Sequence, residues 1–257
     1  MSDPDLRAGV AQALFDKALQ LGEADRIEEA IDAYDELLSR FGQVADGGTR
    51  ALVADALVNK GYLLDKSHRT AEAVEVYADV VARFGQATEP ELRELAVGAL
   101  IDQGVLLGEL GRRDDGVALY TAAITAIGEA ASPSLEGKLA TALFNKAATI
   151  SRLERDREAL TLYDELVARY IESSEPELRV HVARALGNKG ITLHKLGRIE
   201  DAIAVYDEII ERFGHDKTRA IDAVAVHARR KRAQLRAITY RRRVIAAWRR
   251  RVSNGRR

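Results

Sequence analysis

A tyrosine recurs every 43 residues along this chain, and no insertion or deletion interrupts the spacing. A small residue stands four positions before each of these tyrosines, and a leucine stands twenty positions before it. The tyrosine column consists of Tyr34, Tyr77, Tyr120, Tyr163 and Tyr206. A constant period of this length is typical of solenoids, in which each repeat packs only against its neighbours. The sequence therefore predicts one repeat array, and such arrays mostly present extended surfaces to partners.

The composition agrees with stacked helices and excludes several other classes of protein. Of the 257 residues, 47% are apolar and 31% are charged, and there are only 4 prolines. The absence of cysteine excludes disulfides, thiolate nucleophiles and cysteine-based metal sites. The first residues lack the basic and apolar regions of a secretory signal, and no apolar run reaches the roughly 18 residues that span a membrane. We therefore expect a cytoplasmic protein.

Each repeat has the pattern of a helical hairpin, which the fifth repeat shows most clearly. Apolar residues with helical spacing run over 176–196, and Gly197 ends the pattern. A second amphipathic helix follows over 200–212. Ser174 and Glu177 have the spacing of a capping box, and the proline between them suits a first helical turn. One hairpin cannot bury both apolar faces, whereas stacked hairpins can.

The motifs of the fifth repeat are specific enough to indicate a family. They are Ala185-Leu186-Gly187-Asn188-Lys189-Gly190, Leu193, Leu196-Gly197, residues 200–203 and Tyr206. Shorter versions occur in the second and fourth repeats at Asn59-Lys60-Gly61 and Asn145-Lys146-Ala147. In residue type and offset these motifs resemble the tetratricopeptide repeat family. A 43-residue period is longer than the 34 usual there and falls in the range of HEAT and armadillo repeats. The Gly-x5-Leu-Gly and Ala-x3-Tyr contacts nevertheless favour the tetratricopeptide family.

The resemblance implies an all-α fold, a right-handed α-solenoid of five helical hairpins followed by a basic C-terminal helix. It divides the chain into an N-terminal arm over residues 1–9, five repeats over 10–214, and a basic capping helix with its tail over 215–257. We expect almost no β-strand.

No motif indicates catalysis. No two of the five histidines lie four residues apart on a helix with a glutamate, so no zinc-protease motif is present. They are His68, His181, His194, His215 and His227, and we expect all of them to be structural or solvated. Gly47-Gly48 lacks the lysine that a phosphate-binding loop needs. We therefore predict no enzymatic activity, no cofactor and no metal site.

In the tetratricopeptide repeat family the first helices of the hairpins line a groove that binds peptides. The resemblance places two largely apolar columns on these helices: Phe15, Val58, Ile101 and Phe144, and Leu19, Tyr62, Val105, Ala148 and Ile191. One interpretation is that they pack against neighbouring helices. The other is that they form an apolar groove for a peptide or an amphipathic helix.

Asparagine forms a third column on the first helices, at Asn59, Asn145 and Asn188, and a lysine follows each one. This pairing resembles family members that hold the C-terminal carboxylate of a peptide. The alternative is that each asparagine only bonds neighbouring backbone.

The C-terminal region is strongly basic, although the whole chain carries a net charge of only −1. Residues 223–257 hold 13 Lys and Arg and no acidic residue, which leaves 26 basic and 40 acidic side chains in the first 222 residues. No Gly or Pro interrupts 218–252, so one long helix is predicted. Its charged cluster is Arg241, Arg242, Arg243, Arg249, Arg250 and Arg251, together with Trp248.

A capping helix would cover the last apolar face of the array but would not require every charge to be positive. A run of arginines can bind an acidic protein partner, the acidic array of the same or another copy, or nucleic acid. An anionic membrane surface is a fourth possible ligand, and the sequence favours it least. The leading prediction is a non-catalytic scaffold for protein–protein interaction whose basic helix contacts an acidic partner. The alternative is a nucleic-acid-binding regulator that uses the basic tail.

Overall fold

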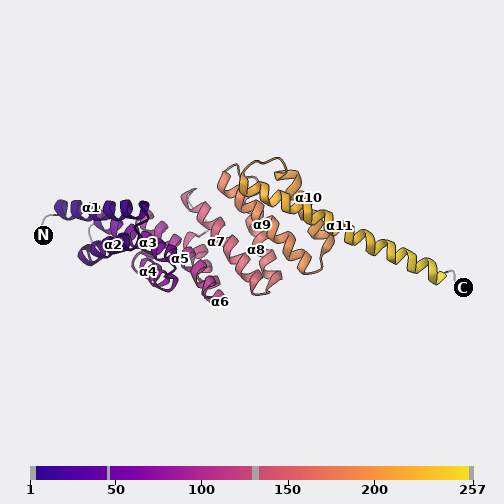
Figure 1. Ribbon diagram of the computed structural model, residues 1–257, viewed down its shortest axis with the longest axis horizontal. Helices are drawn as coiled ribbons and strands as arrows, with labels where there is room; N and C mark the ends of the chain where they lie inside the picture. The colour runs from indigo at the N-terminus through magenta and orange to yellow at the C-terminus, as the bar shows by residue number, and fades with distance from the viewer. Residues whose placement is uncertain (1–3, 45–46, 129–132, 255–257) are drawn as a thin grey trace. The chain divides into compact units, whose positions relative to one another are not determined.

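The structure is a computed structural model that describes residues 4–44, 47–128 and 133–254 (Figure 1). These residues form eleven helices and no strand. The helices are α1 Pro4–Glu23, α2 Ile27–Phe41, α3 Gly47–Lys66, α4 Thr70–Phe84, α5 Pro90–Glu109, α6 Arg113–Ile127, α7 Pro133–Arg152, α8 Asp156–Tyr170, α9 Pro176–Lys195, α10 Ile199–Phe213 and α11 Arg219–Asn254. The predicted all-α solenoid of consecutive hairpins is confirmed.

The helix boundaries repeat with the same 43-residue step as the tyrosines. The first helices of the five hairpins, α1, α3, α5, α7 and α9, have 20 residues each, and the second helices have 15. Helix α1 begins at Pro4, so the N-terminal arm is shorter than the predicted 1–9. Helix α11 begins at Arg219, 43 residues after Pro176, and therefore stands in the position of a sixth first helix.

The chain divides into two compact parts, residues 1–145 and 146–257, called here the N-terminal and C-terminal parts. The N-terminal part contains α1–α6 and the first residues of α7, and the C-terminal part contains the end of α7 and α8–α11. Within each part, first helices contact one another directly: α1 contacts α3, α3 contacts α5, and α9 contacts α11. The first helices thus form one layer in each part, and their outer side is called here the first-helix face.

The recurrent tyrosine fastens the two helices of a hairpin together. The rings of Tyr77 and Tyr206 lie directly against the backbone of Gly61 and Gly190, where no side chain separates the helices. All five tyrosines of the column are at least 96% buried. The tyrosines therefore belong to the core and offer no surface to a ligand.

Each hairpin turn contains one residue with left-handed backbone conformation, again at intervals of 43 residues. The φ angles are +59° at Asp25, +63° at His68, +82° at Gly111, +61° at Glu154 and +75° at Gly197. This conformation ends a helix because it turns the chain away from the helix axis. The prediction that Gly197 stops the first helix of the fifth hairpin is confirmed. The next position in the series is Tyr240, which lies within α11, so the helix continues through it.

The start of α9 agrees only in part with the sequence interpretation. The helix begins at Pro176 as predicted, but its N-cap residue is Glu175, and no side chain caps the helix. The Ser173 hydroxyl instead accepts a hydrogen bond from the Glu175 backbone N–H at 3.2 Å. The predicted capping box between Ser174 and Glu177 is therefore wrong.

Candidate interaction surfaces

The first-helix face of the N-terminal part carries a column of exposed apolar side chains. Leu19 on α1, Tyr62 on α3 and Val105 on α5 occupy the same repeat position, and all three are exposed. Tyr62 is the largest of them and is 59% exposed. Since α3 contacts both α1 and α5, the three side chains stand on successive helices of one layer. Exposed apolar side chains gathered in this way are typical of interaction sites.

The second apolar column belongs to the helix packing and not to the surface. Ile101 and Phe144 are only 5% and 7% exposed, while Phe15 and Val58 are half-buried. The Phe15 ring packs edge-on against Tyr34, with ring centroids 5.9 Å apart. The prediction that Ile101 and Phe144 face a ligand is therefore corrected, because the neighbouring helices cover them.

Carboxylates lie on the same three helices as the apolar column of the N-terminal part. Asp16 and Asp102 are exposed, and Asp55 is half-buried. Packing against the protein raises the pKa of Asp102 and of Asp55, because it removes part of the water that stabilises the charged form. Asp65 raises the pKa of Asp102 further by like-charge repulsion, and Lys138 opposes this shift. This face therefore combines apolar contact area with negative charge.

The asparagine column makes contacts inside the array. The Asn59 side-chain amide donates to the Asp55 backbone carbonyl at 2.8 Å, and Asn188 hydrogen-bonds the hydroxyl of Tyr163. Asn145 is half-buried. The Asn59 bond agrees with the alternative in which asparagine only bonds neighbouring backbone, whereas Asn188 bonds a side chain of the preceding helix α8.

A basic residue at the repeat position after the asparagine column joins one first helix to the previous hairpin. The ion pairs are Lys60–Asp35 at 2.5 Å, Lys189–Asp164 at 2.6 Å and Arg232–Asp207 at 2.9 Å. All three lie at the same repeat positions, so Arg232 of α11 continues a contact that ordinary first helices make. The first half of α11 therefore docks on the array as a first helix does.

The first helix α9 of the C-terminal part carries exposed charges of both signs, among them Glu177, and Lys195 pairs with Asp156 at 3.1 Å. Ile191 is exposed, Ala148 is half-buried, and the basic residues Arg184 and Lys195 of α9 are exposed. Burial lowers the pKa of His181, and Arg184 lowers it further. A positive field of this kind favours the neutral imidazole.

Helix α11 has a packed half and an exposed half. Ile221, Ala225, Ala228 and Leu235 are buried, and α11 contacts α9 and α10. From Tyr240 to Arg249 every side chain is exposed, and this stretch extends past α9 and α10 (Figure 1). It includes the predicted residues Arg241, Arg242, Arg243, Trp248 and Arg249. The side chains of Arg250 and Arg251 lie outside the described residues.

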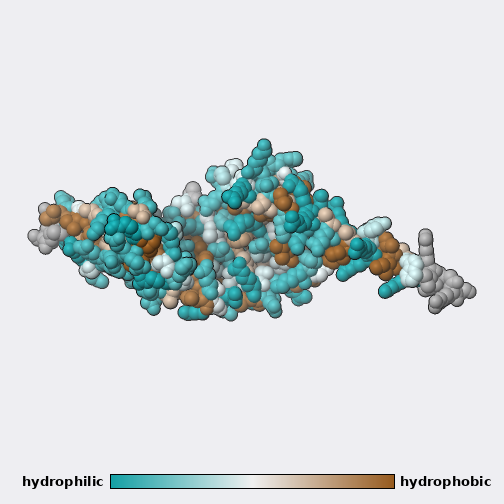
Figure 2. Space-filling view, viewed as in Figure 1, coloured by the Kyte–Doolittle hydropathy of each residue, from teal (hydrophilic) through white to brown (hydrophobic). Residues whose placement is uncertain are grey.

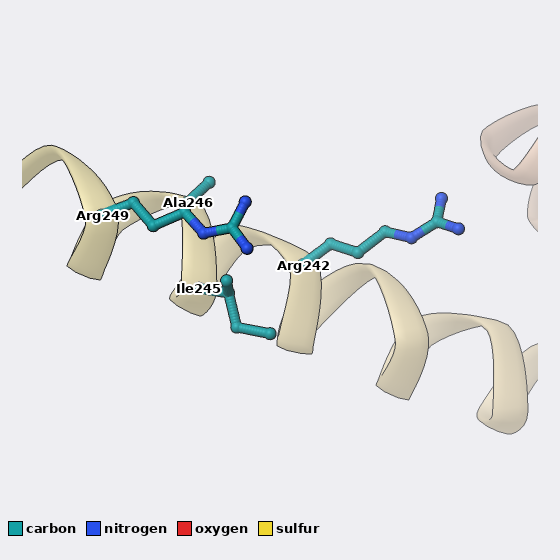
Figure 3. A pocket seen from close by; sticks show the side chains of 4 residues that line it. All are labelled: Arg242, Ile245, Ala246 and Arg249. Carbon is teal, nitrogen blue, oxygen red and sulfur yellow. The ribbon is translucent and has the colours of Figure 1, made fainter.

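A shallow hollow on the exposed half of α11 is lined by Arg242, Ile245, Ala246 and Arg249. Figure 3 shows that all four side chains come from this one helix and that Arg249 folds back along it towards Ile245. A hollow formed by one helix has no opposite wall. It is therefore part of an open helix surface.

The part of the chain that the structure describes offers neither a metal site nor a membrane span. In that part, no group of three or more His, Asp or Glu side chains lies close enough to hold a metal ion. None of the helices described combines the length and the apolar character needed to cross a membrane.

Helical hairpins that stack with a constant period, fastened by a small residue under a tyrosine, define a class of helical repeat proteins. Models of the tetratricopeptide repeat match residues 11–88 and 138–214. The chain therefore belongs to the tetratricopeptide repeat family, whose members are generally non-catalytic and usually bind proteins. No curated protein has a sequence significantly similar to this one.

Several solved structures share the fold at low sequence identity. A Podosopora anserina protein described as a kinesin light chain with nearly identical TPR-like repeats has a TM-score of 0.60 and 12% identity over 87% of this chain and 98% of its own. A tetratricopeptide repeat protein from Parabacteroides merdae gives 0.59 and 13% over 88% and 76%. BtubC (BKLC) from P. vanneervenii gives 0.52 and 19% over 95% and 91%. At these identities the likeness concerns the fold alone.

Proposed function

We propose that this protein is a non-catalytic, cytoplasmic scaffold that binds a peptide or helix of a partner protein on its first-helix face. The observation that carries the proposal is the exposed apolar column Leu19, Tyr62 and Val105 on three adjacent first helices. Aromatic side chains in such positions often supply a large share of binding energy. The family's general role in protein binding supports the same conclusion.

The charge of this face specifies the chemistry of the ligand. Asp16, Asp55 and Asp102 lie on the same helices as the apolar column, so a segment with Lys or Arg beside its apolar residues is complementary. Packed helices are about 8–10 Å apart. A polyproline II segment advances about 3.1 Å per residue and returns to the same side every three residues. A ligand that crosses the helices in this conformation therefore needs apolar side chains about three residues apart.

Selection from a displayed random peptide library on the immobilised full chain tests the proposal. We expect enriched peptides to combine spaced apolar residues with Lys or Arg. Their affinity for Tyr62→Ala should be at least about tenfold weaker than for the wild type, as is typical of aromatic anchors. Tyr240→Ala is the matched control, since Tyr240 is an exposed tyrosine outside this face. Equal binding to wild type and Tyr62→Ala would rule out the first-helix face as the site.

We further propose that α11 contacts an acidic partner. The support is its exposed series of Arg241, Arg242, Arg243 and Arg249 in a region without acidic residues. Nucleic acid is the alternative ligand, and a titration with a DNA duplex at increasing salt separates the two. Several arginine–phosphate contacts would make the affinity fall steeply with salt. An absence of binding at low salt would remove the nucleic-acid alternative.

A further inference from the structure

Helix α11 occupies the position of a first helix, yet the position of its second helix is empty among the described residues. Its start, its ion pair to Asp207 and its packing on α9 and α10 all match those of ordinary first helices. In the other hairpins the chain turns at the position equivalent to Tyr240 and returns as a second helix. Here the helix continues to Asn254. The side of α11 that a second helix would cover is therefore exposed.

Two repeat positions demonstrate this exposure. The first position is at most 2% exposed in all five first helices, where it holds Ala11, Ala54, Val97, Ala140 and Ala183. Its equivalent in α11, Val226, is 47% exposed. The second position is the small residue that lies under the tyrosine, as at Gly190, and it is buried in all five. Its equivalent, Ala233, is exposed.

The exposed side continues along the helix as an apolar stripe. Val226, Ala233, Ala237, Tyr240, Val244 and Trp248 follow one another at intervals of three, four or seven residues, which places them on one side of a helix, and all are exposed. We call this set the open stripe. Figure 2 shows apolar side chains on the part of α11 that extends beyond its neighbours. The exposed Arg230 stands within this side, between Val226 and Ala233, and the exposed Arg241 and Arg243 flank it.

We propose that the open stripe binds an acidic amphipathic helix of a partner protein, which takes the place of the missing second helix and sets an aromatic ring over Ala233. The inference deepens the proposed contact between α11 and an acidic partner and rests on it. The aromatic ring follows from the three hairpins in which a tyrosine ring packs on the glycine at this position. The acidic character follows from the 13 basic and no acidic residues of 223–257. The same charge disfavours α11 of a second copy as the occupant.

Helix α10 of this chain supplies a probe with the required properties. Residues 199–213 contain five acidic residues, one arginine and Tyr206, and the ring of Tyr206 packs on Gly190. An isolated helix of this length is only marginally stable in water. With Arg212→Lys in the peptide, a lactam bridge between the Glu208 carboxyl and the new lysine amine, formed with loss of water, would hold the peptide helical. The two positions are suitable because Glu208 and Arg212 already pair at 3.3 Å on the partly exposed side of α10.

Fluorescence anisotropy of this labelled peptide, titrated with the full chain at low salt, tests the proposal. We expect saturable binding that Ala233→Gln weakens at least about tenfold, since a longer side chain fills the space that the tyrosine ring needs. Ala246→Gln is the matched control on another side of α11 and should change the affinity less than about twofold. A Tyr206→Ala peptide should bind at least about tenfold more weakly, and added salt should weaken binding.

Several results would overturn the inference. One is no binding of the helical peptide to the wild type up to about 1 mM, and another is equal binding to wild type and Ala233→Gln. Binding of a DNA duplex or of phosphatidylserine vesicles that Ala233→Gln leaves unchanged, without peptide binding, would assign the arginines to phosphate. Loss of peptide binding in Tyr62→Ala would place the peptide on the first-helix face instead. The two proposals therefore fail separately, because the first is tested at Tyr62 and the second at Ala233.

Discussion

The ring of Tyr206 lies so close to Gly190 that a methyl group added to the glycine would stand 2.6 Å from the ring atom Cε1. The same relationship holds between Gly61 and Tyr77 at 2.9 Å and between Gly104 and Tyr120 at 2.7 Å. The small residue and the tyrosine, which recur together in the repeat, are therefore the two sides of one helix–helix contact. In the first and fourth hairpins an alanine stands in place of the glycine, and the tyrosine is buried all the same.

Gly190→Ala should destabilise the protein by about 1–3 kcal/mol, because the ring and the helix must separate to admit the methyl group. This cost exceeds the gain of up to about 1 kcal/mol that alanine brings to a helix interior. Gly98→Ala is the control, since Lys138 Nζ at 4.0 Å is the nearest atom there, and it should stabilise by roughly 0.5–1 kcal/mol. Urea unfolding measures both. Equal stability of Gly190→Ala and wild type would show that the ring moves freely.

The left-handed turn position should respond to glycine in opposite ways in two hairpins. Glu154 has φ +61°, a conformation that costs a residue with a side chain roughly 1–2 kcal/mol. Glu154→Gly should therefore stabilise the protein by up to about 1 kcal/mol, and Gly197→Ala should destabilise it by about as much. Thermal unfolding compares the two variants with the wild type. A Glu154→Gly variant of lower stability would indicate that the flexibility gained by the unfolded chain dominates.

His181 should make the protein sensitive to mild acid. Burial, followed by the charge of Arg184, lowers its pKa below the ordinary 6.5. The unfolded chain therefore binds the proton more readily than the folded one, so the contribution to stability is present above pH 6.5 and is lost as the pH falls through the folded pKa. Chemical unfolding at pH 7.5 and pH 5 should show a smaller loss for His181→Gln than for the wild type. His194→Gln changes an exposed histidine of the same helix and serves as the control.

Helix α11 should be held to the array by apolar burial more than by its ion pairs. Asp207 accepts from Arg232 at 2.9 Å and from Arg236 at 2.7 Å, but all three side chains are at least 31% exposed. Asp207→Asn should therefore cost about 1 kcal/mol or less, and less still in high salt. Leu235→Ala should cost about 2–5 kcal/mol because the side chain is buried. Urea unfolding measures both variants. If Asp207→Asn lost more stability than Leu235→Ala, the ion pairs and not the apolar burial would hold α11 to the array.

The sequence predicts the architecture well because the period is uniform. The tyrosine column, the position of Gly197 and the long basic helix all follow from residue types at fixed offsets, and the structure agrees with them. The first helix begins at Pro4, before the predicted repeat boundary at residue 10, because Pro4 stands at the same repeat position as Pro176, the first residue of α9.

The candidate surfaces are less predictable because periodicity does not specify which side of a helix its neighbours cover. Tyr62 and Ile101 look equivalent as apolar residues of first helices, yet one is exposed and the other buried. Ile101 precedes the glycine that packs on Tyr120, whereas Tyr62 directly follows the equivalent glycine. The open stripe did leave a signal in the sequence, since Val226 and Ala233 fall in columns that are small or apolar throughout. Only their exposure distinguishes Val226 and Ala233 from the equivalent buried residues of the other first helices, and exposure is known only from the structure.

Tyr240 stands where every earlier hairpin places a residue with positive φ, and tyrosine adopts that conformation only at a cost. The backbone conformation of Tyr240 therefore determines whether the last helix stops at this position or continues through it. A left-handed residue would stop the helix here and free the segment after it to fold back over Val226 and Ala233. The helical residue that is present leaves that surface exposed, and the stretch of α11 that follows it extends past α9 and α10. Because Tyr240 is helical, the residues that follow it continue α11 to Asn254 and leave the open stripe uncovered.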